Sequence, residues 1–368
     1  MDISLYFHIP FCYKKCPYCH FFSFSPKSFH IQNFMLSLFL EWQQKQKLLK
    51  DANIVSIYFG GGTPTLLDEK EIEKILNWIS IPSSCEITIE TNPNISKEKI
   101  FSLKKMGFNR ISMGAQSLDN NDLKTLNRDH TKEDVINTLD DLSRHFDNIS
   151  IDLMYDIPHQ TKISFAKTLQ EIENLPISHI SLYNLTFEPK TAFYKKKEKL
   201  LPFVPDTTLS YEMLNMAISS FQKTGFERYE ISAFAKEGKI SHHNIGYWTG
   251  REFLGFGPSA FSYLDKKRFQ NTSNFETYLQ NLKNGQSAVS FEEKLDYPDS
   301  LHELLAINLR MIKGVDLDQF QKVEKLPSST HAILSKLEKE NLLVKDKNRI
   351  YLSEKGRLFY DEVAETII

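Results

Sequence analysis

The chain has 368 residues, of which 41% are hydrophobic and 25% are charged, and these are ordinary values for a globular protein. Its 45 Lys and Arg against 47 Asp and Glu leave a net charge of −2, so charge predicts neither a nucleic-acid nor a membrane partner. The N-terminus lacks the basic and apolar regions of a signal peptide, and we expect a soluble, cytoplasmic protein. Three of the four cysteines lie close together, which in a reducing compartment favours a metal site over disulfides.

Short β-branched and aromatic runs alternate with segments of helical periodicity over the first two thirds of the chain. We predict strands over residues 4–9, 54–59, 85–90, 110–114, 149–154 and 179–186. We predict helices over residues 28–50, 68–78, 96–106, 132–146, 164–173 and 207–224. Repeated β/α units indicate an α/β fold with a parallel sheet, either doubly wound or closed into a full or partial barrel. In both forms, ligands bind at the C-terminal ends of the strands.

The pattern changes after about residue 290. Helices are expected over residues 301–311, 328–339 and 354–367, with a hairpin over 343–352. This order resembles a winged helix, but the segment lacks a dense basic stripe, so we favour a packing module over a nucleic-acid partner. We divide the chain into a barrel (residues 1–225), a connecting segment (226–290) and a small C-terminal winged-helix-like α+β domain (291–368).

The three clustered cysteines, Cys12, Cys16 and Cys19, have the spacing C-x3-C-x2-C directly after the first predicted strand. Three thiolates suit an iron–sulfur cluster, and a four-iron cluster held by three cysteines keeps one iron open to a ligand. A structural zinc site is one alternative, but His20 adjoins Cys19 too closely to be a comfortable fourth ligand, and Cys85 is distant. Cysteines without a shared role are the other alternative.

Further polar residues fall at the C-terminal ends of the predicted strands. The run Gly60-Gly61-Gly62-Thr63 follows the second strand, and consecutive glycines allow the backbone to approach a ligand closely. Glu90 ends the third strand, and its carboxylate suits ribose hydroxyls; Arg128, which follows the fourth strand, suits a carboxylate. Gln116 and Asp152 lie at the ends of the fourth and fifth strands. A simple turn, helix caps and a structural ion pair are the alternatives, but the shared position favours a binding site.

The cysteine spacing, placed after the first strand of a β/α array, resembles the radical S-adenosylmethionine (SAM) superfamily. This resemblance implies a [4Fe–4S] cluster on Cys12, Cys16 and Cys19 whose open iron binds SAM. The motifs from Tyr6 onward further resemble the family of the oxygen-independent coproporphyrinogen III dehydrogenases (HemN type) and their HemW heme-chaperone relatives. The resemblance covers nearly the whole chain and implies a partial (β/α)6 barrel with a C-terminal domain.

The same resemblance implies roles for individual residues. It places Tyr6, Gly61 and Glu90 near the cluster-bound SAM. A second SAM site, as in the dehydrogenase, would involve Tyr18, Gly62, Thr63, Gln116, Arg128 and Asp152, with the backbone around Thr186 and Phe261.

Three features favour the chaperone branch. Phe21 stands where the dehydrogenases have a fourth cysteine, and the first strand begins at residue 4 without an N-terminal extension. In addition, His243-Asn244-Ile245-Gly246-Tyr247-Trp248 matches the H-N-x-x-Y-W motif of HemW-like proteins. A His can ligate heme iron, and aromatic rings offer the macrocycle an apolar surface. Core packing of the motif is the alternative, and the adjacent His242 complicates the choice of ligand.

The resemblance thus implies a protein that binds a [4Fe–4S] cluster, SAM and heme and delivers heme to respiratory hemoproteins, with only peripheral membrane contact. Radical decarboxylation of coproporphyrinogen III is the enzymatic alternative. The chain departs from the family at His20, where the chaperones commonly have an acidic residue, and at Asp156 and His159, where glycines are usual. The oligomeric state is left open, a homodimer included.

Overall fold

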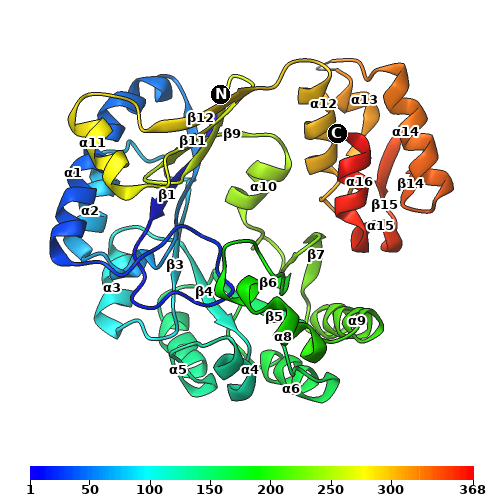
Figure 1. The fold of residues 1–368 in the computed structure, drawn as a ribbon, viewed down its shortest axis with the longest axis horizontal. Helices are drawn as coiled ribbons and strands as arrows, with labels where there is room; N and C mark the ends of the chain where they lie inside the picture. Colours follow the sequence, from blue (N-terminus) through cyan, green and yellow to red (C-terminus); the bar gives the residue numbers. More distant parts are fainter. Residues whose placement is uncertain (323) are drawn as a thin grey trace.

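The computed structural model describes residues 1–322 and 324–368 (Figure 1). Its main element is a 12-stranded sheet in the order β12-β11-β10-β9-β1-β2-β3-β4-β5-β6-β8-β7. The central strands run parallel: β9 (Glu252–Phe256), β1 (Asp2–Ile9), β2 (Asn53–Gly61), β3 (Glu86–Thr91), β4 (Arg110–Gln116), β5 (Ile149–Tyr155) and β6 (His179–Asn184). The sheet curves into a barrel (Figure 1). The barrel is open because its two edge strands, β12 and β7, do not pair with each other.

Helices surround the outer face of this sheet (Figure 1). They are α1 (Ser28–Lys45), α2 (Glu69–Asn77), α3 (Lys97–Lys105), α4 (Asn120–Thr125), α5 (Lys132–Ser143), α6 (Lys162–Ile172) and α9 (Thr207–Lys223). The core lies between helices and sheet, where Phe7 of β1 stacks between Phe59 of β2 and Phe256 of β9, with ring centroids 5.1 and 5.0 Å apart. The predicted α/β fold, a partial (β/α)6 barrel with a C-terminal domain, is confirmed.

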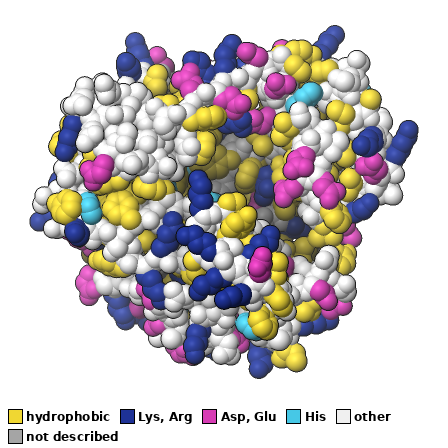
Figure 2. Space-filling model, viewed as in Figure 1, with side chains coloured by type: hydrophobic (Ala, Val, Ile, Leu, Met, Phe, Trp, Pro, Cys, Tyr) yellow, Lys and Arg dark blue, Asp and Glu magenta, His cyan; other side chains and the backbone are white. Residues whose placement is uncertain are grey.

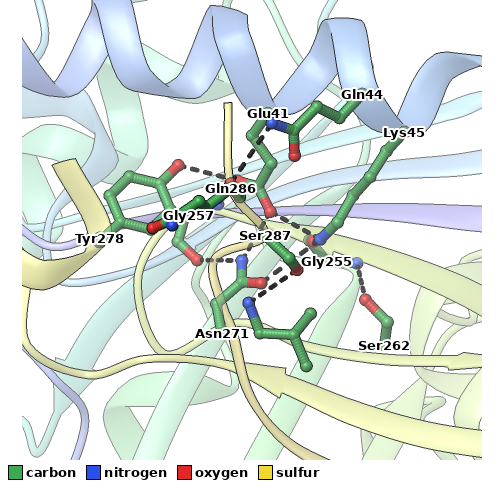
Figure 3. A network of polar contacts seen from close by, with 11 residues as sticks. Glu41, Gln44, Lys45, Gly255, Gly257, Ser262, Asn271, Tyr278, Gln286 and Ser287 are labelled. Carbon is green, nitrogen blue, oxygen red and sulfur yellow. Dashed lines mark hydrogen bonds and ion pairs between the residues drawn. The ribbon is translucent and has the colours of Figure 1, made fainter. Parts of the chain in front are cut away.

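A buried polar network fastens α1 to the loop that follows β9 (Figure 3). Glu41, only 1% exposed, accepts hydrogen bonds from Lys45, Asn271 and Tyr278 and from the backbone N–H of Gly257. Four donors stabilise a carboxylate that would otherwise be costly to bury. A Cβ on Gly257 would lie 2.4 Å from the carbonyl oxygen of residue 8, so the network holds this loop tightly against the end of β1.

The segment over residues 226–290, expected as a connection, contributes strands to both edges of the sheet. Strands β7 (Glu227–Glu230) and β8 (Ala233–Ala235) follow β6, while β10 (Phe261–Leu264), β11 (Lys267–Asn271) and β12 (Val289–Lys294) follow β9. It also forms helices α10 (His242–Trp248) and α11 (Phe275–Lys283). These strands are short, and most side chains of β12 are exposed, so the segment lacks the apolar runs that identify buried strands.

The C-terminal domain has its own apolar core, which includes Leu305, Leu337 and Val363. It contains α12 (Asp299–Asn308), β13 (Val315–Asp316), α13 (Leu317–Phe320), α14 (Ser328–Lys339), β14 (Leu343–Asp346), β15 (Arg349–Leu352), α15 (Glu354–Leu358) and α16 (Tyr360–Ile367). The single helix expected over residues 354–367 is therefore wrong, because the chain leaves helical geometry at Phe359 (ψ 35°). In Figure 1 the domain lies beside α10. None of the described helices is both long and apolar enough to cross a bilayer.

Candidate functional site

A cavity of about 630 Å³ opens at the C-terminal ends of the parallel strands, and Figure 2 shows the hollow near the centre of the molecule. Its wall contains the cysteine loop between β1 and α1 and the ends of β2 to β6. Of the predicted site residues, the wall includes Cys12, Cys16, Tyr18, Cys19, Gly61, Gly62, Thr63, Glu90, Gln116, Arg128, Asp152, Thr186 and Asn244. The fold therefore brings together residues up to 232 positions apart in the chain, from Cys12 to Asn244.

The cysteine loop is closed at its base by paired hydrogen bonds. The N–H of Cys12 donates to the carbonyl of Phe24 at 3.0 Å, and the N–H of Phe24 donates to that of Pro10 at 2.9 Å. Phe11 is fully buried and packs edge-on against Phe34 of α1 at 5.2 Å. Because the base is fixed in the core, the three cysteines project from the loop over the cavity.

The three thiols are free and partly exposed, and two of them contact polar side chains. The Sγ of Cys12 lies 3.2 Å from Thr63 Oγ1, and the Sγ of Cys16 accepts a hydrogen bond from Arg128 Nη1 at 3.1 Å. Burial raises the pKa of the Cys12 and Cys19 thiols, so a metal must displace their protons. Among the described residues, no three His, Cys, Asp or Glu side chains are placed to hold a single metal ion.

Hydrogen bonds connect two of the cysteines through Thr63 and Asn92, which follow β2 and β3, and through Arg128, which follows α4. Thr63 Oγ1, beside Cys12, accepts from Asn92 Nδ2 at 3.2 Å, and Asn92 Oδ1 accepts from Arg128 Nη2 at 2.8 Å. Arg128 in turn donates to Cys16 and to the carbonyl of Gly114 at 2.9 Å. Its buried Nε has no partner in the described structure, and the residue itself lies in the cavity wall.

The glycine run lets β2 end very close to β1. A Cβ on Gly62 would lie 2.4 Å from the carbonyl oxygen of Phe11, and Gly61 has φ of +105°, a region that favours glycine. The N–H groups of Gly61, Gly62 and Thr63 donate to Glu90 and to the carbonyls of Ile9 and Phe11. These N–H groups are thus hydrogen-bonded within the protein. The glycine run places the end of β2 in the cavity wall.

Two carboxyl groups, those of Glu90 and Asp152, lie in the cavity wall and are largely shielded from solvent. Glu90 accepts from Tyr58 OH at 2.8 Å and from the Gly61 N–H at 3.1 Å. Burial raises the pKa of Glu90 to about 7, with a smaller contribution from Asp152, and burial raises the pKa of Asp152 to about 6. The ion pair considered for Asp152 is not formed with any described residue. Both groups can therefore change protonation near neutral pH.

Two residues assigned to SAM by resemblance lie outside the cavity wall. Tyr6 is behind it, where its hydroxyl bonds His8 Nδ1 at 3.0 Å while His8 Nε2 donates to the Phe22 carbonyl at 2.8 Å. Phe261 begins β10 with its side chain 45% exposed, and the cavity does not reach it. Sequence reasoning also missed Asn92, although its position directly after β3 was the available signal.

Helix α10, which carries the H-N-x-x-Y-W motif, is largely turned inward. His243 is 1% exposed, its Nδ1 bonds Ser56 Oγ and its Nε2 bonds Tyr247 OH, both at 2.9 Å. Because Ser56 donates its own proton to Ser4, His243 carries its proton on Nδ1 and accepts from Tyr247 at Nε2. Burial lowers the pKa of His243 to about 3, which keeps it neutral. Both ring nitrogens are therefore engaged within the protein.

The remaining aromatic residue of the motif contacts the C-terminal domain. The Arg310 guanidinium lies 4.2 Å from the ring centre of Trp248 and 5.0 Å from that of Tyr360. Arg310 also pairs with Glu230 of β7, whose side chain is 5% exposed, at 3.3 Å. Trp248 is thus part of the seam between barrel and C-terminal domain, and of the motif only Asn244 reaches the cavity wall.

Comparisons with known proteins agree with this architecture. The family model of the radical SAM superfamily matches residues 6–172, and that of the HemN C-terminal domain matches residues 295–359. The heme chaperone HemW of Bacillus subtilis is 30% identical, over 98% of this chain and 97% of its own. The heme chaperone HemW of Lactococcus lactis is 32% identical, over 96% of this chain and 94% of its own.

A solved structure resembles the whole fold. Coproporphyrinogen III oxidase (HemN) from Escherichia coli, described as a radical SAM enzyme, superimposes with a TM-score of 0.87 at 24% identity, over 100% of this chain and 90% of that one. At that identity the likeness concerns the fold alone. An open β/α barrel with three cysteines after its first strand defines a radical SAM protein. Within that superfamily, the chain belongs to the HemW family.

Proposed function

We propose that this protein is a heme chaperone that holds a [4Fe–4S] cluster and SAM and delivers heme to hemoproteins. The observation that carries the proposal is the similarity, at 30–32% identity over nearly the whole length, to proteins named heme chaperone HemW. Phe21, in place of a fourth cysteine, supports the chaperone over the decarboxylase. Respiratory hemoproteins are the acceptors we propose, reached through peripheral contact at the membrane.

The cysteine loop fits an iron–sulfur cluster better than a single ion. Three thiols on one fixed loop are soft ligands, and a cubane takes them on separate irons, so they need not converge on one point. The adjacent Arg128 and Thr63 supply hydrogen-bond donors to two of the sulfur atoms, and such bonds stabilise thiolate charge. We assign the cluster to Cys12, Cys16 and Cys19.

The cavity beside the loop fits SAM in size and chemistry. Its volume of about 630 Å³ lies inside the range of small-ligand sites. The guanidinium of Arg128 in the cavity wall suits the carboxylate of SAM, and Glu90 and Asp152 suit its hydroxyl and amino groups. One-electron chemistry is what the cluster and SAM supply when bound; the residues named here bind, orient and shield them from water.

The test is heme transfer. Protein reconstituted anaerobically with iron and sulfide is titrated with hemin and then mixed with an apo-hemoprotein, whose absorbance reports heme arrival. We expect tight 1:1 binding and transfer. The same protein, given coproporphyrinogen III, SAM and a reductant, should form no protoporphyrinogen. Failure to bind hemin, or sustained decarboxylation, would contradict the proposal in favour of the enzymatic alternative.

A further inference from the structure

The cavity continues from the C-terminal ends of the strands down the inside of the barrel. Every second residue of β4 lies in its wall, from Gln116 through Gly114 and Ser112 to Arg110, the first residue of the strand. At about 3.3 Å per residue, this stretch of strand is about 20 Å long. Arg110 lies about 13 Å of strand before Gly114, whose carbonyl bonds Arg128. The cavity therefore has a deep end that is remote from the cysteine loop.

Helix α10 covers this deep end. The backbone N–H groups of His242 and His243 donate to the two carboxyl oxygens of Glu86, the first residue of β3, at 3.0 and 2.9 Å. The ring of His243 bonds Ser56, which pairs with Glu86 in the register of β2 and β3. Asn244, the next residue of the helix, lies in the cavity wall. The helix thus closes the N-terminal end of the barrel, and Asn244 belongs to the floor of the cavity.

Arg110 is a buried charge without a partner near this floor. Its side chain is 1% exposed and its Nε is buried and unbonded. Among the described residues, none forms a hydrogen bond or an ion pair with its guanidinium. Thr88, which pairs with Arg110 in the register of β3 and β4, has a buried hydroxyl that also lacks a partner. Buried polar groups are normally hydrogen-bonded, and a buried charge is costly unless it is paired, so the two groups together point to a ligand.

The carboxyl groups in the same wall do not neutralise Arg110 permanently. Neither Glu90 nor Asp152 forms an ion pair with it in the described structure. Burial raises the pKa of these two groups to about 7 and about 6, whereas a guanidinium stays charged. Among the described strands, β4 alone contributes a Lys or Arg to the cavity wall. A single guanidinium matches one carboxylate, whereas a phosphate dianion would keep part of its charge unpaired.

We propose that the deep end of the cavity binds the carboxylate of a small organic acid, with Arg110 as the residue that holds it. The guanidinium suits two parallel hydrogen bonds to the carboxylate, and Ser112 and Asn244 lie in the same wall. Arg110 lies two residues deeper than Glu90, the deepest wall residue assigned to SAM, because Glu90 pairs with Ser112. The rest of the acid extends along the barrel toward the cysteine loop. This site goes beyond heme delivery and does not depend on it.

The test uses trifluoropropionate, a small carboxylate whose fluorine NMR signal reports binding, and its neutral amide. Each is titrated under anaerobic conditions into the cluster-loaded protein, and we expect saturable binding of the carboxylate and much weaker binding of the amide. Arg110→Gln should raise the Kd of the carboxylate by about tenfold or more, because charge-assisted hydrogen bonds are lost. Arg128→Gln is the matched control, since Arg128 is the other arginine in the wall, and it should bind the carboxylate as wild type does.

Arg110→Gln loses no described hydrogen bond, so its urea midpoint should not fall below that of wild type. Should it fail to fold, Arg110→Lys, which keeps the charge but not the planar fork, should weaken binding severalfold. The comparison of carboxylate with amide in wild type needs neither variant.

Further additions locate the carboxylate within the cavity. SAM added after the carboxylate should not release it, and inorganic phosphate should compete only in large excess. Release by SAM, competition by phosphate at equal concentration, equal binding of the amide or unchanged affinity in Arg110→Gln would each overturn the inference. Heme transfer is measured separately, so each of these results leaves the chaperone proposal standing.

Discussion

The cysteine loop and helix α10 carry the two most distinctive motifs of the chain, and they place their side chains in opposite ways. The loop fixes its backbone at the base and leaves its thiols partly exposed over a cavity. Helix α10 directs His243 into the barrel, where Ser56 and Tyr247 bond both nitrogens, and directs Trp248 against the C-terminal domain. The loop keeps ligands free for chemistry, whereas α10 uses its polar groups to hold parts of the protein together.

The first prediction concerns the cluster. Replacing any one of Cys12, Cys16 and Cys19 by Ala should abolish the bound iron and sulfide counted after anaerobic reconstitution. The cluster is assigned to these three cysteines, and each variant removes one of its ligands. Folding stability should change little, since the thiols are only partly buried. Cys85→Ala is the control: its thiol is 2% exposed and lies outside the cavity wall, so iron content should be kept. Full iron content in all three loop variants would contradict the assignment.

The second prediction concerns the seam beside α10. Arg310→Ala leaves the nearly buried Glu230 without its charged partner, which should lower the free energy of unfolding by about 3–5 kcal/mol. Trp248 fluorescence should shift with the loss of the guanidinium over its ring. Iron content should not change. Urea unfolding measures the effect, and Lys336→Ala, whose pair with Glu340 is exposed, should stay within about 0.5 kcal/mol of wild type. Loss of the cluster in Arg310→Ala would contradict the proposal that the seam beside α10 and the cysteine loop act independently.

The barrel was predictable from the sequence because its central strands are buried on both faces and form continuous apolar runs. Because these strands are parallel, their C-terminal ends lie at the same edge of the sheet. The parallel topology therefore predicted that Glu90, Gln116 and Asp152 would lie close together. The edge strands β10 to β12 were missed, since a short exposed strand with mixed polarity has no such signal.

The finer features of the site depend on contacts that no local pattern contains. The ring of His243 is bonded by Ser56, which is far away in the chain. Asn92 joins the site because it bonds Thr63, which follows β2, and Arg128, which follows α4. A metal-binding motif and a buried structural motif can have the same amino-acid sequence, and only the hydrogen-bond partners of the residues in the folded chain distinguish them.

The third prediction tests whether α10 is structural. His243→Ala removes a buried, doubly bonded ring and should lower the free energy of unfolding by about 2–3 kcal/mol near neutral pH, whereas the exposed His242→Ala should change it by less than about 0.5 kcal/mol. The pKa of His243 is about 3 in the folded protein and 6.5 in its ordinary state. Its contribution to stability is therefore lost as pH falls from 6.5 toward 3. The gap between wild type and His243→Ala should shrink over that range; a gap that widens in acid would contradict a buried neutral ring.

The smallest expected effect on stability belongs to Glu90 in the cavity wall. Its dependence on pH has the opposite sign to that of His243 in α10. The pKa of Glu90 rises from 4.5 to about 7 on folding, so between these values the folded state holds a proton that the unfolded state has released. Wild type thus loses stability as pH rises from 4.5 to 7, by on the order of 2 kcal/mol, whereas Glu90→Gln cannot titrate. Urea unfolding across that range should show the variant gaining on wild type, and Asp152→Asn should do the same between 3.8 and about 6. SAM binding by Glu90→Gln, measured by calorimetry, should weaken most above pH 7, where the wild-type carboxylate is ionised. A variant that loses ground to wild type as pH rises would mean that Glu90 is ionised in the folded apo protein and that the cavity wall is more polar than its burial indicates.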